Sequence, residues 1–321
     1  MSATVTATAG DRVGVLLLTF GSAVTSADVP AYLRSVRGGR EPSDELVAEF
    51  RRRFDAIGRS PLVDITQAQA SALEAMLGAR HGAGRFAVRA GMLHSEPRVA
   101  GALADLAAAG VHRIIAVVLA PQFSPLILSG YQRTIDEVGP QVAPGVPVQL
   151  AGAWHLTPSW LASLSDRVRE ALDGLPEPLR GGAGVVFTTH SLPRPVVERD
   201  PGYMDQVHAT IDAVAARAGL EPGSWSFAFQ SAGHTPEEWL TPDLLEVLPG
   251  LRERGLEDVL VVPVQFVADH LEILYDIDIA AASQAAEAGL RFHRIEMPNT
   301  TPRFIAALAE VVERELAPAP V

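Results

Sequence analysis

The residues most able to do chemistry lie at positions 266–278, where acidic side chains recur at short spacing. Asp269, Glu272 and Asp276 are three and four residues apart, which would place all three on one face of a helix. Carboxylates this close raise each other's pKa unless they share a proton or a cation, so the spacing indicates metal or proton handling. The same carboxylates also have a purely structural interpretation. Asp269 and Glu272 also resemble a helix capping box, and His270, on another face, would then pack or cap.

A second candidate is His190, which directly follows an apolar run and opens the sequence His-Ser-Leu-Pro. Its imidazole has a near-neutral pKa and could accept a proton or bind a metal ion. A hydrogen-bonded structural histidine is the alternative. Both this histidine and the acidic segment follow predicted strands, so we expect them to open onto one crevice.

Two further segments could bind a substrate. Arg34, Arg37 and Arg40 recur every three residues, and arginine holds carboxylates with two parallel hydrogen bonds, so they could dock an acidic substrate. Solvated surface is the alternative. The mostly apolar segment 120–131 could cover a flat hydrophobic ligand, or it could simply pack in the core.

The elements that must position these residues alternate along the chain. Short β-branched runs are separated by longer helical patterns, which is typical of βαβ units and a largely parallel sheet. The predicted strands are 13–20, 85–91, 113–120, 148–152, 184–190 and 258–266, and predicted helices include 66–77, 98–109, 131–138 and 244–254.

The second half of the chain repeats the plan of the first. The run 184–190 echoes 14–20, and 258–266 echoes 113–123. We therefore predict an α/β fold of two Rossmann-like, doubly wound halves with parallel sheets, facing a cleft beyond the carboxyl ends of the strands. We expect a flexible N-terminus at 1–10, a first half at 11–153, a second half at 154–316 with a hinge near 176–184, and a flexible tail at 317–321. No glycine-rich phosphate-binding motif is present.

Composition narrows the functional classes. The chain has 321 residues, with 26 basic and 38 acidic side chains and a net charge of −12, which argues against binding nucleic acid or an anionic membrane surface. It has no cysteine, which excludes disulfides, thiolate metal sites and iron–sulfur clusters. No signal peptide or apolar run of membrane-spanning length is visible, so we expect a cytoplasmic protein without an integral membrane segment.

Taken together, these segments resemble the ferrochelatase family, specifically the Gram-positive type that metallates coproporphyrin III. The resemblance runs from about residue 14 to about residue 316. Its motifs are Arg-Gly-Gly-Arg at 37–40, Ala-Ile-Gly-Arg-Ser-Pro-Leu at 56–62, Ile-Thr-Gln-Ala-Gln-Ala at 65–70, Leu-Ala-Pro-Gln-Phe-Ser at 119–124, His-Ser-Leu-Pro at 190–193, Gln-Ser-Ala-Gly-His-Thr-Pro at 230–236, Phe-Val-Ala-Asp-His-Leu-Glu at 266–272 and Met-Pro-Asn at 297–299.

The resemblance implies a lyase that inserts ferrous iron into a porphyrin, expected to be coproporphyrin III, giving coprohaem in haem biosynthesis. It implies that His190 and Glu272 are the catalytic pair, and that both contact the metal together with Asp276. Iron would be a substrate, with no tightly bound cofactor. We expect a monomer, with other haem-pathway proteins as candidate partners. The residues implied to contact the porphyrin are Phe20, Arg37, Ser60, Ser124, Tyr131 and Phe229.

Three positions depart from the family pattern. Phe20 stands where relatives usually carry a tyrosine, Phe229 where a tryptophan is common, and Ala280 where the acidic row often continues. Two other functions stay open on the sequence. One is a tetrapyrrole chelatase acting on sirohydrochlorin with cobalt or iron, and the other is a porphyrin or haem carrier without catalysis.

Overall fold

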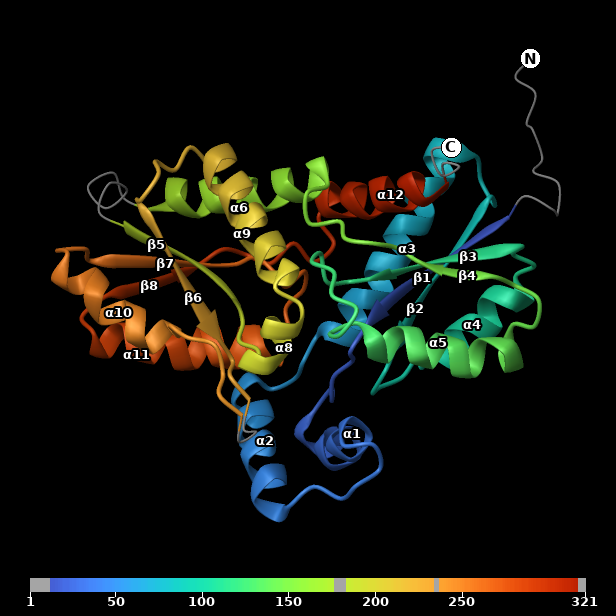
Figure 1. Ribbon diagram of the computed structural model, residues 1–321, viewed down its shortest axis with the longest axis horizontal. Helices are drawn as coiled ribbons and strands as arrows, with labels where there is room; N and C mark the ends of the chain where they lie inside the picture. Colours follow the sequence, from blue (N-terminus) through green and yellow to red (C-terminus); the bar gives the residue numbers. More distant parts are fainter. Residues whose placement is uncertain (1–11, 176–182, 234–236, 317–321) are drawn as a thin grey trace.

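The computed structural model describes residues 12–175, 183–233 and 237–316. Two α/β halves lie side by side, and a smaller helical lobe projects below them in the view of Figure 1. The predicted flexible ends, and most of the predicted hinge, fall outside the described residues. Within the described part, no helix combines the length and apolar character needed to cross a bilayer.

The first half contains a parallel sheet covered by helices on both faces. In sheet order its strands are β2 (Phe86–Met92), β1 (Val13–Thr19), β3 (Arg113–Val118) and β4 (Val148–Leu150), and its helices are α3 (Leu62–His81), α4 (Val99–Ala108) and α5 (Ser129–Val142). In β1, Val15 and Leu17 face the core under α3, whereas Leu16 and Leu18 face the core under α4 and α5. A strand buried on both faces must be apolar throughout, which is why the continuous apolar run predicted it correctly.

The second half repeats this arrangement. In sheet order its strands are β6 (Trp225–Gln230), β5 (Ala183–His190), β7 (Asp258–Pro263) and β8 (Arg291–Arg294), and its helices are α6 (Pro158–Gly174), α8 (Arg194–Arg199), α9 (Gly202–Ala218), α10 (Leu244–Glu253), α11 (Ala282–Glu287) and α12 (Pro302–Leu316). The last helix, α12, crosses back and packs against α3 and β3 of the first half. One hydrophobic core therefore runs through both halves.

The projecting lobe has a small core of its own. It consists of a short 3₁₀ turn (Ser26–Asp28), α1 (Val29–Val36) and α2 (Asp44–Ile57). Ser43 caps α2 by accepting a hydrogen bond from the main-chain N–H of Leu46. Phe54 of α2 is fully buried, and Leu271 of the second half packs against this core. The lobe is thus held beside the segment that leads into the acidic helix.

The two sheets match in strand order and in register, so the predicted repetition of one plan is confirmed. The central strand pairs with its neighbours in the order β2-β1-β3-β4 in one half and β6-β5-β7-β8 in the other. Val13 pairs with Arg113, and Ala183 pairs with Asp258, at the start of the corresponding strands. Counting from these pairs, Phe20 is equivalent to His190. The predicted α/β fold with two Rossmann-like parallel halves is correct.

The acidic segment is the main local difference from the prediction. Its helix begins at Glu272 and is a π-helix, η2 (Glu272–Ala281), which continues into α11. The residue before it, Leu271, makes no side-chain cap, and Asp269 is hydrogen-bonded to Asn299 instead. The predicted capping box is therefore wrong, because the Asp269 carboxylate accepts a hydrogen bond from Asn299, thirty positions away.

Candidate active site

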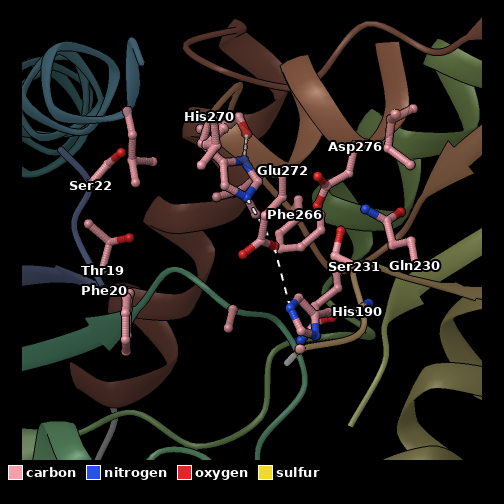
Figure 2. A pocket seen from close by; sticks show the side chains of 18 of the residues that line it. Thr19, Phe20, Ser22, His190, Gln230, Ser231, Phe266, His270, Glu272 and Asp276 are labelled. Atoms are coloured by element: carbon pink, nitrogen blue, oxygen red, sulfur yellow. Dashed lines mark hydrogen bonds and ion pairs between the residues drawn. The ribbon is translucent and has the colours of Figure 1, made fainter. Parts of the chain in front are cut away.

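A cavity of about 710 Å³ lies at the carboxyl ends of the parallel strands. Residues that follow β1, β3, β5 and β7 line it, together with residues of the helical lobe and of η2. This is the place where an open parallel sheet offers main-chain ends and loops to a ligand, and the volume lies within the range of small-molecule sites. The ionisable side chains labelled in Figure 2, namely His190, His270, Glu272 and Asp276, all come from the second half.

His190 and Glu272 face one another across this side of the cavity. His190 ends β5, and its Nε2 lies 3.7 Å from Oε2 of Glu272, at the start of η2. The other ring nitrogen, Nδ1, is bonded to the carbonyl oxygen of Ser191. A carbonyl only accepts hydrogen bonds, so Nδ1 carries a proton; in the neutral form of the ring the unprotonated nitrogen is therefore Nε2, the one that faces Glu272.

Glu272 has a second histidine neighbour. Nε2 of His270 lies 3.6 Å from the same carboxylate oxygen, and Nδ1 of His270 donates to the carbonyl of Ala268 at 3.0 Å. His270 packs against the ring of Phe266, with ring centroids 4.5 Å apart, as the structural interpretation expected, and it also lines the cavity. Burial would raise the pKa of Glu272, but the facing His190, then His270 and Arg53, lower it to about 2. Glu272 is thus a carboxylate held ionised between two imidazoles.

Asp276 lies four residues further along η2 and has the opposite electrostatic tendency. Burial and the nearby negative charge of Glu272 raise its pKa, although Ser231 and Arg53 lower it in part. Nη1 of Arg53 approaches the Asp276 carboxylate at 3.5 Å. The helix therefore carries an ionised carboxylate at its start and a more easily protonated one a turn later.

The third predicted carboxylate does not join this pair. Asp269 accepts a hydrogen bond from Nδ2 of Asn299 at 2.7 Å, and Arg294 of β8 lies 3.5 Å away. It is absent from the cavity lining among the described residues. The predicted stripe of three carboxylates therefore reduces to Glu272 and Asp276, because the helix starts after Asp269.

The residues implied to contact a porphyrin fall into two groups. Three of them line the cavity, at the end of β1, in α5 and at the end of β6: Phe20, Tyr131 and Phe229. Phe20 is 44% exposed, and its ring packs against His94 with the ring centroids 4.4 Å apart and the ring planes at 60°. Burial raises the pKa of Tyr131, so that its hydroxyl stays protonated.

The other three lie outside this lining. Arg37 is exposed at the C-terminal end of α1. Ser60 is buried and donates its main-chain N–H to Val24. Ser124 is also buried, and its hydroxyl accepts hydrogen bonds from two main-chain N–H groups of its own loop. Contacts of these three residues with a porphyrin remain predictions.

The cavity lining also includes residues that had not been singled out from the sequence, among them Arg53 and Gln265. Arg53 lies in α2, bonds Glu49 at 2.9 Å and covers the ring of Tyr275 at 5.3 Å. It is the last of three consecutive arginines, and only the packing of α2 selects the one that faces inward. Gln265 follows β7 and contacts the main chain of His190. The sequence feature that could have identified Gln265 is the similarity of Pro-Val-Gln-Phe to the first-half motif Ala-Pro-Gln-Phe.

Two parallel α/β halves facing a shared cavity define a chelatase-type fold. The solved structure of SirB from Bacillus subtilis with Fe³⁺ has a similar fold, with a TM-score of 0.57 over 95% of this chain and 96% of that chain. The two sequences are 16% identical, so the likeness concerns the fold alone.

Residues 12–316 match the family described as Ferrochelatase, and the chain belongs to that family. A ferrochelatase from Deinococcus radiodurans is 37% identical over 306 residues, covering 95% of this chain and 96% of the relative. A coproporphyrin III ferrochelatase from Geobacillus thermodenitrificans is 36% identical over 307 residues, with the same coverage. The protein is thus an enzyme that inserts ferrous iron, its substrate, into a porphyrin in haem biosynthesis, as predicted.

Proposed function

We propose that the porphyrin substrate is coproporphyrin III and that the product is coprohaem. The support comes from the relatives named coproporphyrin III ferrochelatase, which match nearly the whole chain. Coproporphyrin III carries four propionates, whereas protoporphyrin IX carries two. Arg53 in the cavity wall and Arg37 on the lobe offer guanidinium groups to such carboxylates.

We further propose that His190 and Glu272 carry out the proton and metal steps. Iron insertion must remove two protons from the pyrrole nitrogens and strip water from the ferrous ion. An unprotonated Nε2 of His190 can accept a pyrrole proton, and the ionised Glu272 can receive it or attract the cation. The observation that carries this proposal is the 3.7 Å approach of Nε2 to Oε2 at the cavity wall.

Asp276 would act next along the helix. A proton received by Glu272 has a nearby acceptor there, because the raised pKa of Asp276 favours its protonated form. Imidazole and carboxylate are also ligands that ferrous iron accepts, so the same residues suit a passing metal ion. In this scheme, the order of pKa values along η2 directs protons away from the porphyrin.

The experiment is an anaerobic assay with ferrous iron and either coproporphyrin III, protoporphyrin IX or sirohydrochlorin. We expect the metalloporphyrin spectrum to develop fastest with coproporphyrin III, measured as kcat/KM. Equal kcat/KM for coproporphyrin III and protoporphyrin IX would contradict the substrate assignment. Turnover of His190→Ala close to that of the native enzyme would contradict the assigned proton acceptor.

A further inference from the structure

The main chain at His190 lies where β5 loses one of its neighbours. The pairing of β5 with β7 ends at Thr188 and Pro263, and the last main-chain bond between them runs from the Val264 N–H to the Thr188 carbonyl at 2.9 Å. Two residues further along β5, the N–H of His190 donates to a side chain instead. Its acceptor is Oε1 of Gln265, at 3.0 Å.

The amide of Gln265 is held at both ends. Its oxygen also accepts the hydroxyl of Thr189 at 2.6 Å, and its nitrogen donates to the hydroxyl of Tyr203 at 2.7 Å. Thr189 is fully buried, and Tyr203, in α9, is 2% exposed. Buried partners on both ends leave the amide little freedom to rotate, so it can fix the main chain that carries His190.

The first half makes the same turn without an amide. There the N–H of Leu119 donates to the carbonyl of Leu18 at 2.8 Å. In the register of the strands, this hydrogen bond corresponds to the one from Val264 to Thr188 in the second half. The residue that follows Leu119 is Ala120, which corresponds in register to Gln265, just as Phe20 corresponds to His190. The turn itself therefore does not require an amide. The amide occurs in the half whose strand end carries the histidine.

We propose that Gln265 is a positioning residue for iron insertion, and that it fixes the main chain of His190 so that Nε2 faces Glu272. It acts through the N–H of His190 and touches no reacting atom. The inference rests on the proposed role of His190 as proton acceptor. Because the orientation of the His190 imidazole affects the chemical step, loss of Gln265 should lower kcat and leave porphyrin binding nearly unchanged.

The test compares two substitutions at one position. Gln265→Leu keeps the approximate volume and removes both hydrogen-bonding ends, and we expect kcat to fall by about 10- to 100-fold with KM for the porphyrin within about threefold. Gln265→Glu keeps an acceptor for both His190 and Thr189, and Tyr203 can donate to its second oxygen. We expect the kcat of Gln265→Glu to stay within about threefold of that of the native enzyme.

The matched control is Gln122→Leu. Gln122 belongs to the corresponding first-half motif, is buried, and donates to Thr210 of α9 at 3.1 Å outside the cavity lining. It should lower the Tm about as much as Gln265→Leu and leave kcat unchanged. If Gln265→Leu lowers kcat no more than this control does, the inference is overturned.

The two proposals can fail separately. Substantial turnover by His190→Ala would remove the proposed function of that histidine, and the positioning role with it. An inactive His190→Ala together with native turnover by Gln265→Leu would overturn the positioning role alone.

Discussion

The ends of β1 and β5 occupy equivalent places in two matching sheets, yet they contribute differently to the cavity. β1 is followed by Phe20, an exposed phenyl ring that packs at a tilt against His94. β5 ends in His190, whose two ring nitrogens and main-chain N–H all have polar neighbours. The same backbone frame thus presents an apolar wall on one side and acid–base groups on the other.

The loops after β3 and β7 differ in the same way. Gln122 and Phe123 of the first loop turn away from the cavity and bond Thr210 and Gln206 of α9. The glutamine of the second loop, Gln265, bonds the main chain of His190 at the end of β5 instead. The repeated motif therefore joins the two halves at one site and holds the end of β5 at the other. Its function depends on what lies opposite, not on the motif alone.

The largest expected effect comes from removing the group that distinguishes β5 from β1. His190→Ala should lower iron insertion by about 100- to 10,000-fold, since a positioned general base contributes about that much. Porphyrin binding, measured by fluorescence quenching, should stay within about tenfold, or 1.4 kcal/mol. Phe20→Ala is the matched change in the first half and should weaken binding more than it lowers kcat. The reverse pattern would mean that the two strand ends have been assigned the wrong way round.

Glu272→Gln should have the next largest effect, about 100-fold on kcat near neutral pH. Stability gives an independent check. With a folded-state pKa of about 2, below the usual 4.5, ionised Glu272 stabilises the fold above pH 4.5, and this contribution is lost as the pH falls through about 2. Urea unfolding of the variant should therefore depend less on pH between about 5 and 2.

Asp276→Asn provides a control of opposite sign for this titration. The pKa of Asp276 is raised in the folded protein, so the fold loses stability as the pH rises from the usual Asp pKa of 3.8 through the raised pKa. The variant should be more stable than the native protein near neutral pH. If both variants change stability in the same direction, the electrostatic roles assigned to η2 are incorrect.

Phe20→Tyr should have a moderate effect confined to the product complex. It adds a hydroxyl where a phenyl ring now offers iron no oxygen ligand. We expect a shifted absorption spectrum of the bound ferric product and about tenfold slower product release, which would also slow turnover. Phe50→Tyr, at another point of the cavity wall, is the control and should leave the spectrum unchanged. An unchanged spectrum in Phe20→Tyr would show that this ring does not face the metal.

Arg37→Ala should have the smallest effect. If this exposed guanidinium binds a propionate, the ratio of kcat/KM for coproporphyrin III to that for protoporphyrin IX should fall by about threefold. This is the modest effect expected of a solvated charge pair. Arg59→Ala, an exposed arginine paired with Asp64, is the control. Equal changes in both variants would remove Arg37 from substrate selection.

Much of the fold was predictable because its signals are local. The runs 13–18 and 184–187 have no polar side chain, since both faces of each central strand are buried. The position of His190 and Glu272 at one cavity was predictable for a related reason, because the carboxyl ends of parallel strands meet at one edge of a sheet. The π-helix was not predictable, because carboxylates three and four residues apart suit an α-helix equally well.

The sequence by itself determined the family, the strand ends that open onto the cavity, and the types of side chain available there. Only the tertiary structure decided which of those side chains meet. Asn299 withdraws Asp269 from the acidic row, the docking of α2 brings Arg53 to Asp276, and α9 supplies the tyrosine that holds Gln265. These contacts join residues 30 to 223 positions apart, so they depend on how whole elements pack against one another rather than on any local pattern.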